Sequence, residues 1–302
     1  MTSQRPGRSS APSPARGDLS CCSGLRPPGR KRGLAPSTQL AVAASLYLSF
    51  TDYNLFQPPQ WIGLENFAAM FGDARFWNSF RVTAVYVLVG VPLQLALALA
   101  LALLLDKGMR GLPLYRSVFY LPSLLGGSVA IAILWRQVFG KDGLVNGALA
   151  WFGVDGPGWI GYPDLALGTL VVLNVWTFGS PMVIFLAGLR QVPEMFYEAA
   201  AIDGAGRARR YFSITLPLLT PIVFFNLVLQ VIFAFQAFTQ AYVVCGGPGD
   251  ATMFYTLLLY KEAFTELDMG YASAMAWFLV LVVAAFTAVN FWLSKYWVFY
   301  DD

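Results

Sequence analysis

Long apolar runs separated by short polar stretches dominate the chain after about residue 34. A helix that crosses a membrane needs about 20 mostly apolar residues, and several runs meet this requirement. They cover residues 79–105, 113–139, 166–189, 215–244 and 271–294. A weaker run lies at 34–51, where polar residues leave an apolar core only from Leu40 to Phe50. The pattern predicts an all-α membrane protein with six transmembrane helices, of which the first is weak.

Residues 1–33 lack such a pattern and are rich in Arg, Pro, Ser and Gly. This composition cannot bury a core, so we expect a disordered basic tail at 1–33 and one transmembrane domain at 34–302. We interpret the basic cluster at 30–32 as orienting the first span, rather than as a nucleic-acid or anionic-lipid site. The weak first run leaves open whether residues 1–45 are the native N-terminus, a divergent one, or the product of a misassigned start or a frameshift.

The positions of the basic residues predict the orientation, because Lys and Arg are enriched in cytoplasmic loops. When the N-terminus is placed inside, most of the 20 Lys and Arg residues fall on the cytoplasmic side. They include Arg190, Arg207, Arg209 and Arg210, which lie between the fourth and fifth spans. Both termini are then cytoplasmic, and so is the loop at 190–214.

Composition excludes several function classes. Residues are 57% hydrophobic and only 12% charged, whereas a soluble domain carries about 25% charged residues. Histidine is absent, and the cysteines at 21, 22 and 245 lack the spacing of metal ligands. We therefore predict no metal, no cofactor and no catalytic residue. A membrane-embedded enzyme would need titratable or metal-binding groups near the membrane interface, and scattered carboxylates without histidine argue against one.

The energy source must also lie outside this chain if it is an active transporter. The middle of every predicted span lacks charged residues, whereas proton- and ion-coupled carriers place ionisable groups at membrane depth. The Gly-rich phosphate loop that ends in Gly-Lys-Ser/Thr is absent as well. An ion-coupled secondary carrier conflicts with these uncharged spans, and uptake driven by a proton gradient would revive that alternative.

One charged stretch, from Tyr197 to Pro221, separates the fourth and fifth spans. Glu198 to Ala201 are helix formers, and the helix should end near Gly204, where glycine allows the chain to reverse. Arg207 then begins a second helix that continues into the next span. We expect a short exposed helix, a turn and a return.

This stretch resembles the cytoplasmic signature loop of the membrane subunits of binding-protein-dependent ABC importers. The match in residue type and spacing comprises Glu198, Ala199, Ala200, Asp203, Gly204, Ile214, Leu216 and Pro217. The resemblance implies that the helix ending at Gly204 is a coupling helix, which docks into a cleft on the ATP-hydrolysing subunit. The alternative is an ordinary positive-inside loop that only anchors topology.

Uncharged polar residues in the fifth span indicate a pathway. At about 100° per residue one stripe of this helix carries amides beside an aromatic ring. Amides donate and accept hydrogen bonds, and a ring face packs on the C–H surface of a sugar. Buried amides also join helices within a bundle, so that reading remains open. The stripe holds Asn226, Gln230, Phe233, Gln236, Ala237 and Gln240, and Asn174, Thr177 and a kink at Pro181 in the fourth span are expected beside it.

Further stretches look like the carbohydrate-uptake branch of this family, similar to the maltose and glycerol-phosphate permeases. They lie at 243–249, 259–264, 268–274 and 297–300. The resemblance implies a permease of the bacterial cytoplasmic (inner) membrane, in contact with membrane lipid. Its implied partners are a second homologous permease, an ABC ATPase dimer and an extracytoplasmic solute-binding protein, with no nucleic acid. A permease for another solute, such as glycerol phosphate or a polyamine, remains the same-fold alternative.

Overall fold

The computed structural model describes residues 35–106, 112–244 and 250–298. The predicted tail at 1–33 lies outside the described residues. The chain divides into two units at Ala44 and Ser45. The first unit contributes only the start of one helix to the described part, and the second contains everything that follows.

The described part is mostly helical. In chain order the elements are α1 (Ala35–Leu48), β1 (Thr51–Asp52), β2 (Gln60–Trp61), α2 (Glu65–Gly72), α3 (Ala74–Asp106), α4 (Leu112–Leu125), α5 (Val129–Val138), α6 (Leu144–Ala150), α7 (Pro163–Trp176), α8 (Gly179–Leu189), α9 (Glu194–Ile202), α10 (Arg207–Arg210), the π-helix η1 (Tyr211–Thr215), α11 (Leu216–Phe235), α12 (Thr239–Val244), α13 (Tyr255–Phe264) and α14 (Met269–Trp297).

Four helical stretches are long and apolar enough to cross a membrane. They are Ala74–Asp106, Leu165–Leu189, Arg207–Val243 and Met269–Trp297, and a bent pair, α4 with α5, makes a fifth if it is counted as one span. The apolar part of α1 is shorter, at Gln39–Leu48, which agrees with a weak first run. The count of six spans therefore stays a prediction.

The helical fold class is confirmed, with two local departures. A short antiparallel pair, β1 and β2, places Thr51 opposite Trp61. The run at 113–139 is not one straight helix, because α4 and α5 meet at 96°. Gly126 and Gly127 lie at the break, and Ser128 caps α5 by accepting a hydrogen bond from the amide of Ile131 at 3.3 Å. Two glycines followed by an N-cap serine favour ending one helix and beginning another.

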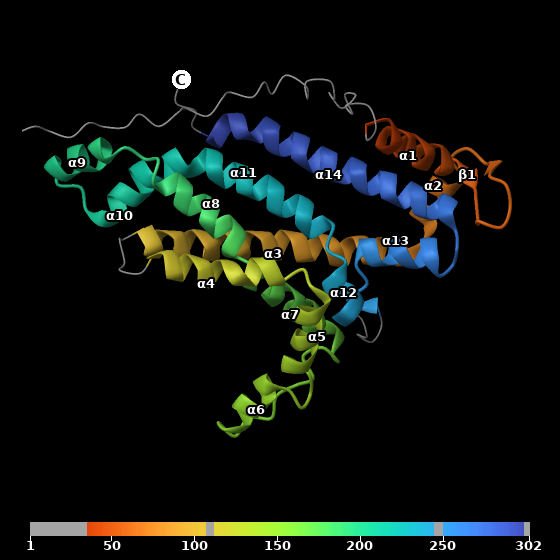
Figure 1. Ribbon diagram of the computed structural model, residues 1–302, viewed down its shortest axis with the longest axis horizontal. Helices are drawn as coiled ribbons and strands as arrows, with labels where there is room; N and C mark the ends of the chain where they lie inside the picture. Colours follow the sequence, from red (N-terminus) through yellow and green to blue (C-terminus); the bar gives the residue numbers. More distant parts are fainter. Residues whose placement is uncertain (1–34, 107–111, 245–249, 299–302) are drawn as a thin grey trace, which may run out of the picture. The chain divides into compact units, whose positions relative to one another are not determined.

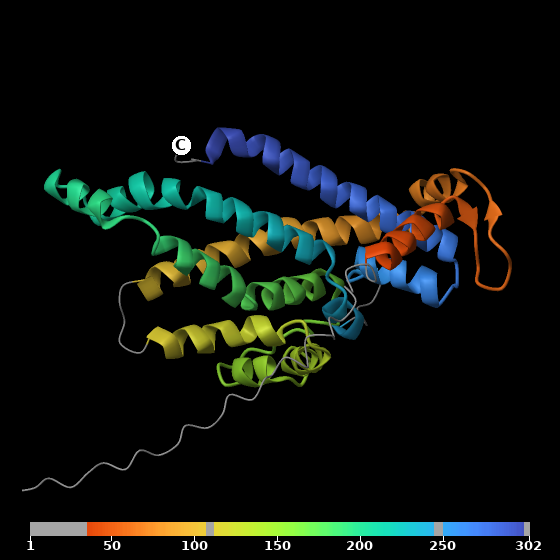
Figure 2. The same cartoon turned by 45° about the horizontal axis from the view of Figure 1, so that its top comes forward.

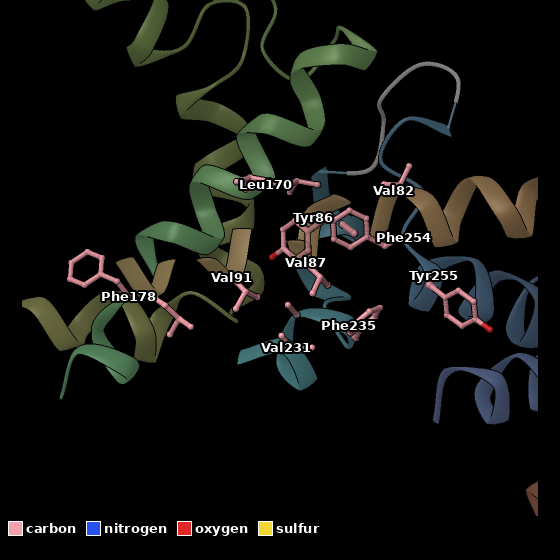
Figure 3. Packing of buried hydrophobic residues seen from close by; sticks show 14 of the residues in the cluster. Val82, Tyr86, Val87, Val91, Leu170, Phe178, Val231, Phe235, Phe254 and Tyr255 are labelled. Carbon is pink, nitrogen blue, oxygen red and sulfur yellow. The ribbon is translucent and has the colours of Figure 1, made fainter. Parts of the chain in front are cut away.

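Within the second unit, α3, α8, α11 and α14 run alongside one another (Figures 1 and 2). Buried apolar side chains join α3 to α11, among them Val87, Val91, Val231 and Phe235 (Figure 3). The helices α9 and α10 lie at one end of this bundle, while α2 and α13 lie at the other (Figure 1). The polar side chains that follow are held between these long helices.

Candidate functional site

A break in the fourth predicted span begins the site. Pro181 has no N–H to donate to the carbonyl of Thr177, four residues earlier, and α7 accordingly ends at Trp176 while α8 begins at Gly179. The freed Thr177 carbonyl accepts hydrogen bonds from Gln94 Nε2 at 3.1 Å and from Ser123 Oγ at 3.0 Å. A backbone group released inside the bundle is thus satisfied by side chains from α3 and α4.

The same break lets α4 approach α8 closely. A Cβ on Gly179 would overlap with the carbonyl oxygen of Phe119, so only glycine fits at this crossing. The amide of Ser180 donates to Ser123 Oγ at 2.7 Å. Ser123 therefore bridges the break between α7 and α8, because it donates a hydrogen bond to Thr177 and accepts one from Ser180.

A cavity of about 410 Å³ lies against this break. Its walls come from α3, the α4–α5 bend, the α7–α8 break, the last turns of α11, and α12 with the residues before it. The lining residues are Tyr86, Gln94, Ser123, Gly126, Gly127, Asn174, Thr177, Ser180, Gln230, Phe233, Ala234, Gln236, Ala237, Phe238, Thr239 and Gln240. Residues more than a hundred positions apart in the sequence thus share one hollow.

The cavity gathers most of the predicted pathway residues. Asn174, Gln230, Phe233, Gln236 and Gln240 all line it, together with the expected neighbours at 177 and 237. Asn226 does not. Its side chain is fully buried in α11, and neither Nδ2 nor Oδ1 has a hydrogen-bond partner among the described residues. A role for Asn226 in the pathway stays a prediction.

The assumption of one continuous helix was wrong for the last part of the stripe. The helix α11 ends at Phe235, residues 236–238 are not helical, and α12 begins at Thr239. Gln240 reaches the cavity because of this interruption, and its Nε2 donates to the carbonyl of Gly126 at 3.0 Å. That bond ties α12 to the bend between α4 and α5.

Gln94, which lies on α3 and is 2% exposed, was not among the predicted pathway residues. Its Nε2 donates to both the carbonyl and the hydroxyl of Thr177 at 3.1 Å, and its Oε1 accepts from Asn174 Nδ2 at 3.5 Å. The signal was present, because Gln94 is the amide in the long apolar run at 84–105. An amide at that depth needs polar partners.

The lining of the cavity suits the recognition of an uncharged polar ligand. Amides, hydroxyls and aromatic rings surround it, and no charged side chain is among its described lining residues. Such groups both donate and accept hydrogen bonds and stack on apolar faces without favouring either sign of charge. In the part of the chain that the structure covers, no group of three His, Cys, Asp or Glu residues is placed to hold a metal ion.

The predicted exposed helix and turn are present in α9 and α10. The helix α9 ends at Ile202, Asp203 caps it, and Gly204 has a φ of +71°, the left-handed conformation that glycine adopts at helix ends. No residue of α9 is buried, and Ile202 is 88% exposed. Tyr197 Oη lies 2.9 Å from Thr215 Oγ1, a hydrogen bond that links α9 to η1.

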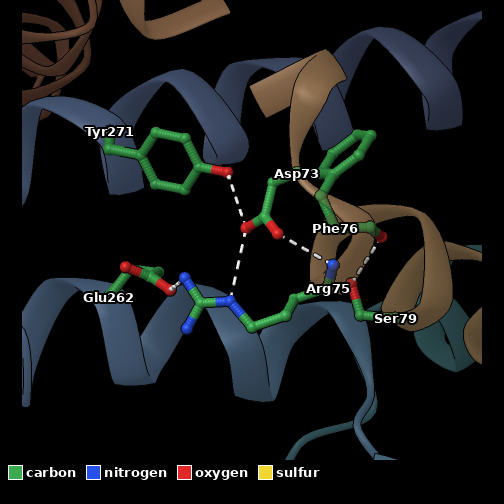
Figure 4. A network of polar contacts seen from close by, with 6 residues as sticks. All are labelled: Asp73, Arg75, Phe76, Ser79, Glu262 and Tyr271. Carbon is green, nitrogen blue, oxygen red and sulfur yellow. Dashed lines mark hydrogen bonds and ion pairs between the residues drawn. The ribbon is translucent and has the colours of Figure 1, made fainter. Parts of the chain in front are cut away.

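The other end of the bundle carries a charged network (Figure 4). Arg75 Nη2 lies 3.3 Å from Glu262 Oε1, and Arg75 Nε lies 3.5 Å from Asp73 Oδ2, which also accepts from Tyr271 Oη at 3.5 Å. Burial raises the pKa of the Glu262 carboxyl above its ordinary value, and the Arg75 guanidinium opposes this rise. The network joins the start of α3 to α13 and α14.

Comparisons with known proteins agree with this architecture. The family described as "Binding-protein-dependent transport system inner membrane component" matches residues 67–298. The chain is 52% identical over 270 residues to the "Probable ABC transporter permease protein YesP" of Bacillus subtilis (strain 168), which covers 88% of this chain and 87% of that protein. It is 32% identical over 261 residues to the "Trehalose/maltose transport system permease protein MalF" of Thermococcus litoralis, covering 85% and 88%.

A solved structure shares the fold. A chain of the "bacterial alginate ABC transporter in complex with alginate pentasaccharide-bound periplasmic protein" matches with a TM-score of 0.74 at 18% identity, over 87% of this chain and 88% of that one. The family resemblance inferred from the residues around Glu198 is thus confirmed. This chain belongs to the inner membrane components of binding-protein-dependent transport systems, the multi-pass permeases of ABC importers, which are not themselves catalytic.

Proposed function

We propose that the 410 Å³ cavity is part of the translocation path for a sugar or oligosaccharide. A second homologous permease completes this path, and an extracytoplasmic binding protein delivers the solute. The observation that supports this proposal is the composition of the lining. Amides and hydroxyls lie beside Phe233 and Phe238, and none of the described lining residues is charged. A polyhydroxylated ring offers many hydrogen-bonding groups and an apolar C–H face, which is the complement of this wall.

The proposed topology has six spans with both termini in the cytoplasm. In this topology α1 makes the first crossing, and α4 and α5 together make one span. The end of the bundle that carries α9 and α10 then faces the cytoplasm, where Arg190, Arg207, Arg209 and Arg210 satisfy the positive-inside rule. The end that carries the Arg75 network faces outward.

The helix α9 is, in this proposal, the coupling helix that docks on an ATPase dimer. It has no buried residue within the chain, and Ile202, Met195 and Phe196 are exposed. Helical structure continues without a gap from α10 through η1 to the end of α11 at Phe235, and Gln230 and Phe233 in α11 line the cavity. Movement of α9 when the ATPases close is therefore transmitted along α11 to the cavity wall, and the spans rock to alternate access.

Co-purification tests the docking of α9. The tagged chain is expressed with its neighbouring genes, and the retained ATPase is measured for wild type, Glu198→Lys and Glu194→Lys. Both substitutions reverse one charge on the same exposed helix, but only Glu198 belongs to the signature. We expect the ATPase to be lost with Glu198→Lys and kept with Glu194→Lys. Purification of the wild-type chain without any ATPase, under conditions that preserve complexes, would overturn the assignment.

Uptake tests the path. Gln230→Ala removes an amide from the cavity wall, whereas Gln137→Ala removes an exposed amide of α5 that does not line it. Loss of one hydrogen bond to the solute should slow uptake of a labelled oligosaccharide by about tenfold, and the control should transport normally. Equal uptake by both variants, with unchanged substrate preference, removes Gln230 from the path. Uptake that follows a proton gradient rather than ATP would remove the importer mechanism.

A further inference from the structure

An arginine inside a predicted span, Arg116, has an enclosed nitrogen with no partner among the described residues. Arg116 is on α4, one turn after the helix begins, and its side chain is half-buried. The Nε atom is the enclosed nitrogen, and both ion pairs of the described residues belong to Arg75. An enclosed guanidinium nitrogen without an acceptor is costly. Its position therefore predicts an acceptor that arrives from outside the chain.

Arg116 lines a groove of about 360 Å³ between α4 and α8. Three of the other lining residues carry hydroxyls, so the groove presents one positive charge beside donors that rotate to suit an oxygen ligand. The described lining holds no carboxylate that would neutralise the arginine. The lining residues are Arg116, Ser117, Tyr120, Ser180, Val183 and Ile184.

The groove adjoins the polar cavity at Ser180. Ser180 lines both hollows, and the cavity residue Ser123 lies one turn beyond Tyr120 on α4. Ser123 and Ser180 are held together across the helix crossing by the 2.7 Å hydrogen bond described above. A solute that leaves the amide-lined cavity along α4 passes Ser180 and then meets Arg116. The route thus runs from a neutral wall to a positive one, toward the end that carries α9.

We propose that this groove is an anion-binding station on the translocation route, in which Arg116 takes the carboxylate of an acidic saccharide. The planar guanidinium fork matches the two oxygens of a carboxylate, and Tyr120 and Ser117 supply neutral donors around it. The neutral cavity binds the hydroxylated rings, and Arg116 selects the charged group. This inference rests on the proposed function, because it names the substrate class of the same path.

The phosphate of an anionic lipid offers the same chemistry, and the experiment separates the two sources. The complete importer, with its ATPase retained, is purified, and its melting temperature is measured with digalacturonate and with the dimethyl ester of digalacturonate. We compare wild type, Arg116→Gln and Arg81→Gln. Arg81 lies in α3, is exposed and does not line the groove, so it controls for loss of one arginine from a span.

We expect digalacturonate, but not its ester, to stabilise wild type and Arg81→Gln. The apparent affinity should fall by about tenfold or more in Arg116→Gln, since a hydrogen bond to a charged group is lost. A wild-type complex that does not respond to digalacturonate, or an Arg116→Gln complex that responds as wild type does, overturns the proposal.

A second arm places the same complexes in vesicles of phosphatidylcholine alone or with phosphatidylglycerol. If Arg116→Gln removes only a stimulation of ATPase activity by phosphatidylglycerol, the groove holds lipid and the saccharide proposal is wrong. Failure of the proposed function is distinguishable from either result, because Gln230→Ala and Gln137→Ala would then take up the labelled oligosaccharide equally. A complex that imports neutral oligosaccharides equally with and without Arg116, and ignores digalacturonate, leaves the importer intact and removes only the station.

Discussion

At one end of the bundle, α9 and α10 contain no buried residue. At the other end, buried polar groups hold separate segments of the chain together through hydrogen bonds and an ion pair. There Asn66 Nδ2 donates to the carbonyls of Ser49 at 3.1 Å and Thr51 at 3.0 Å, and Glu262 is 6% exposed beside Arg75. Contacts made within the chain stabilise the end that carries α2 and α13. Surface left free at α9 is available to another protein, and the proposed coupling helix needs that surface.

The largest effect on stability is expected from a substitution at Gly270, at the end of the bundle that carries α2 and α13. A Cβ there would overlap with the carbonyl oxygen of Thr51, and backbone cannot move aside as a flexible side chain does. Gly270→Ala should lower the free energy of unfolding by about 2–3 kcal/mol. The matched control is Gly206→Ala at the free end, where nothing lies within 4 Å of the added carbon. Equal melting temperatures of the two purified variants would contradict the comparison.

A smaller loss is expected from Arg75→Ala. Glu262 then remains buried without the cation that opposes the rise in its pKa, which should cost about 1–2 kcal/mol near neutral pH. Because the folded-state pKa of Glu262 is raised, its contribution to stability is present below the ordinary carboxyl pKa and is lost as pH rises through the folded value.

The variant should therefore approach wild type as the pH falls from about 8 to about 5. Melting temperatures of wild type and Arg75→Ala across this range check the prediction. Arg75→Ala combined with Glu262→Gln serves as the control, because a neutral amide cannot titrate. A deficit of Arg75→Ala that grows toward acid pH would show that the sign is wrong.

At the free end a backbone effect of about 1 kcal/mol is expected from Gly204→Ala, because alanine is strained at a φ of +71°. Gly206 lies two residues away with a φ of −67°, so Gly206→Ala should change the melting temperature little. The strain loosens the turn after α9, and the retained ATPase should decrease in parallel. If the two alanine variants lose equal stability, the conformation at Gly204 does not limit this turn.

The smallest effect on stability is expected from Ile202→Ser. Its side chain is 88% exposed, so the free energy of unfolding should stay within about 0.5 kcal/mol of wild type. The affinity for the ATPase should nevertheless fall by about tenfold, since an exposed apolar side chain on a docking helix gains its contacts in the complex. A clear loss of stability in the isolated chain would mean that Ile202 packs within its own fold.

The two regions also differ in how far the sequence predicted them. The signals around α9 are local, since helix formers precede a glycine and arginines follow it, and the helix ends at Ile202, two residues before Gly204. The cavity depends on contacts across the bundle. Periodicity along one span suggested Gln230 and Phe233, but it carried no information on Gln94 or Ser123, which approach from α3 and α4.

The sequence predicted the breaks within spans only in part. Pro181 predicted a kink in the fourth span, but the interruption falls at residues 177–178, ahead of the proline. It falls there because the lost hydrogen bond belongs to the carbonyl four residues before the proline. The interruption at 236–238 has no proline or glycine, so no local signal announced it. Asn226 shows the limit of predicting a cavity wall from helical periodicity alone. It lies on the expected face of the helix but is buried away from the cavity.

The bend between α4 and α5 bears on the thickness of the surrounding bilayer. At about 1.5 Å per residue the 14 residues of α4 cover roughly 21 Å, whereas the hydrocarbon core of a bilayer is about 30 Å thick. The chain bends by 96° where α4 ends, and in the proposed topology α5 completes the crossing. A crossing bent in this way spans less of the bilayer than a straight helix of the same length, so the acyl chains beside it thin or another protein surface replaces them, and each ångström of mismatch costs a fraction of a kcal/mol. Transport by this protein should therefore depend on the acyl length of the lipids around it.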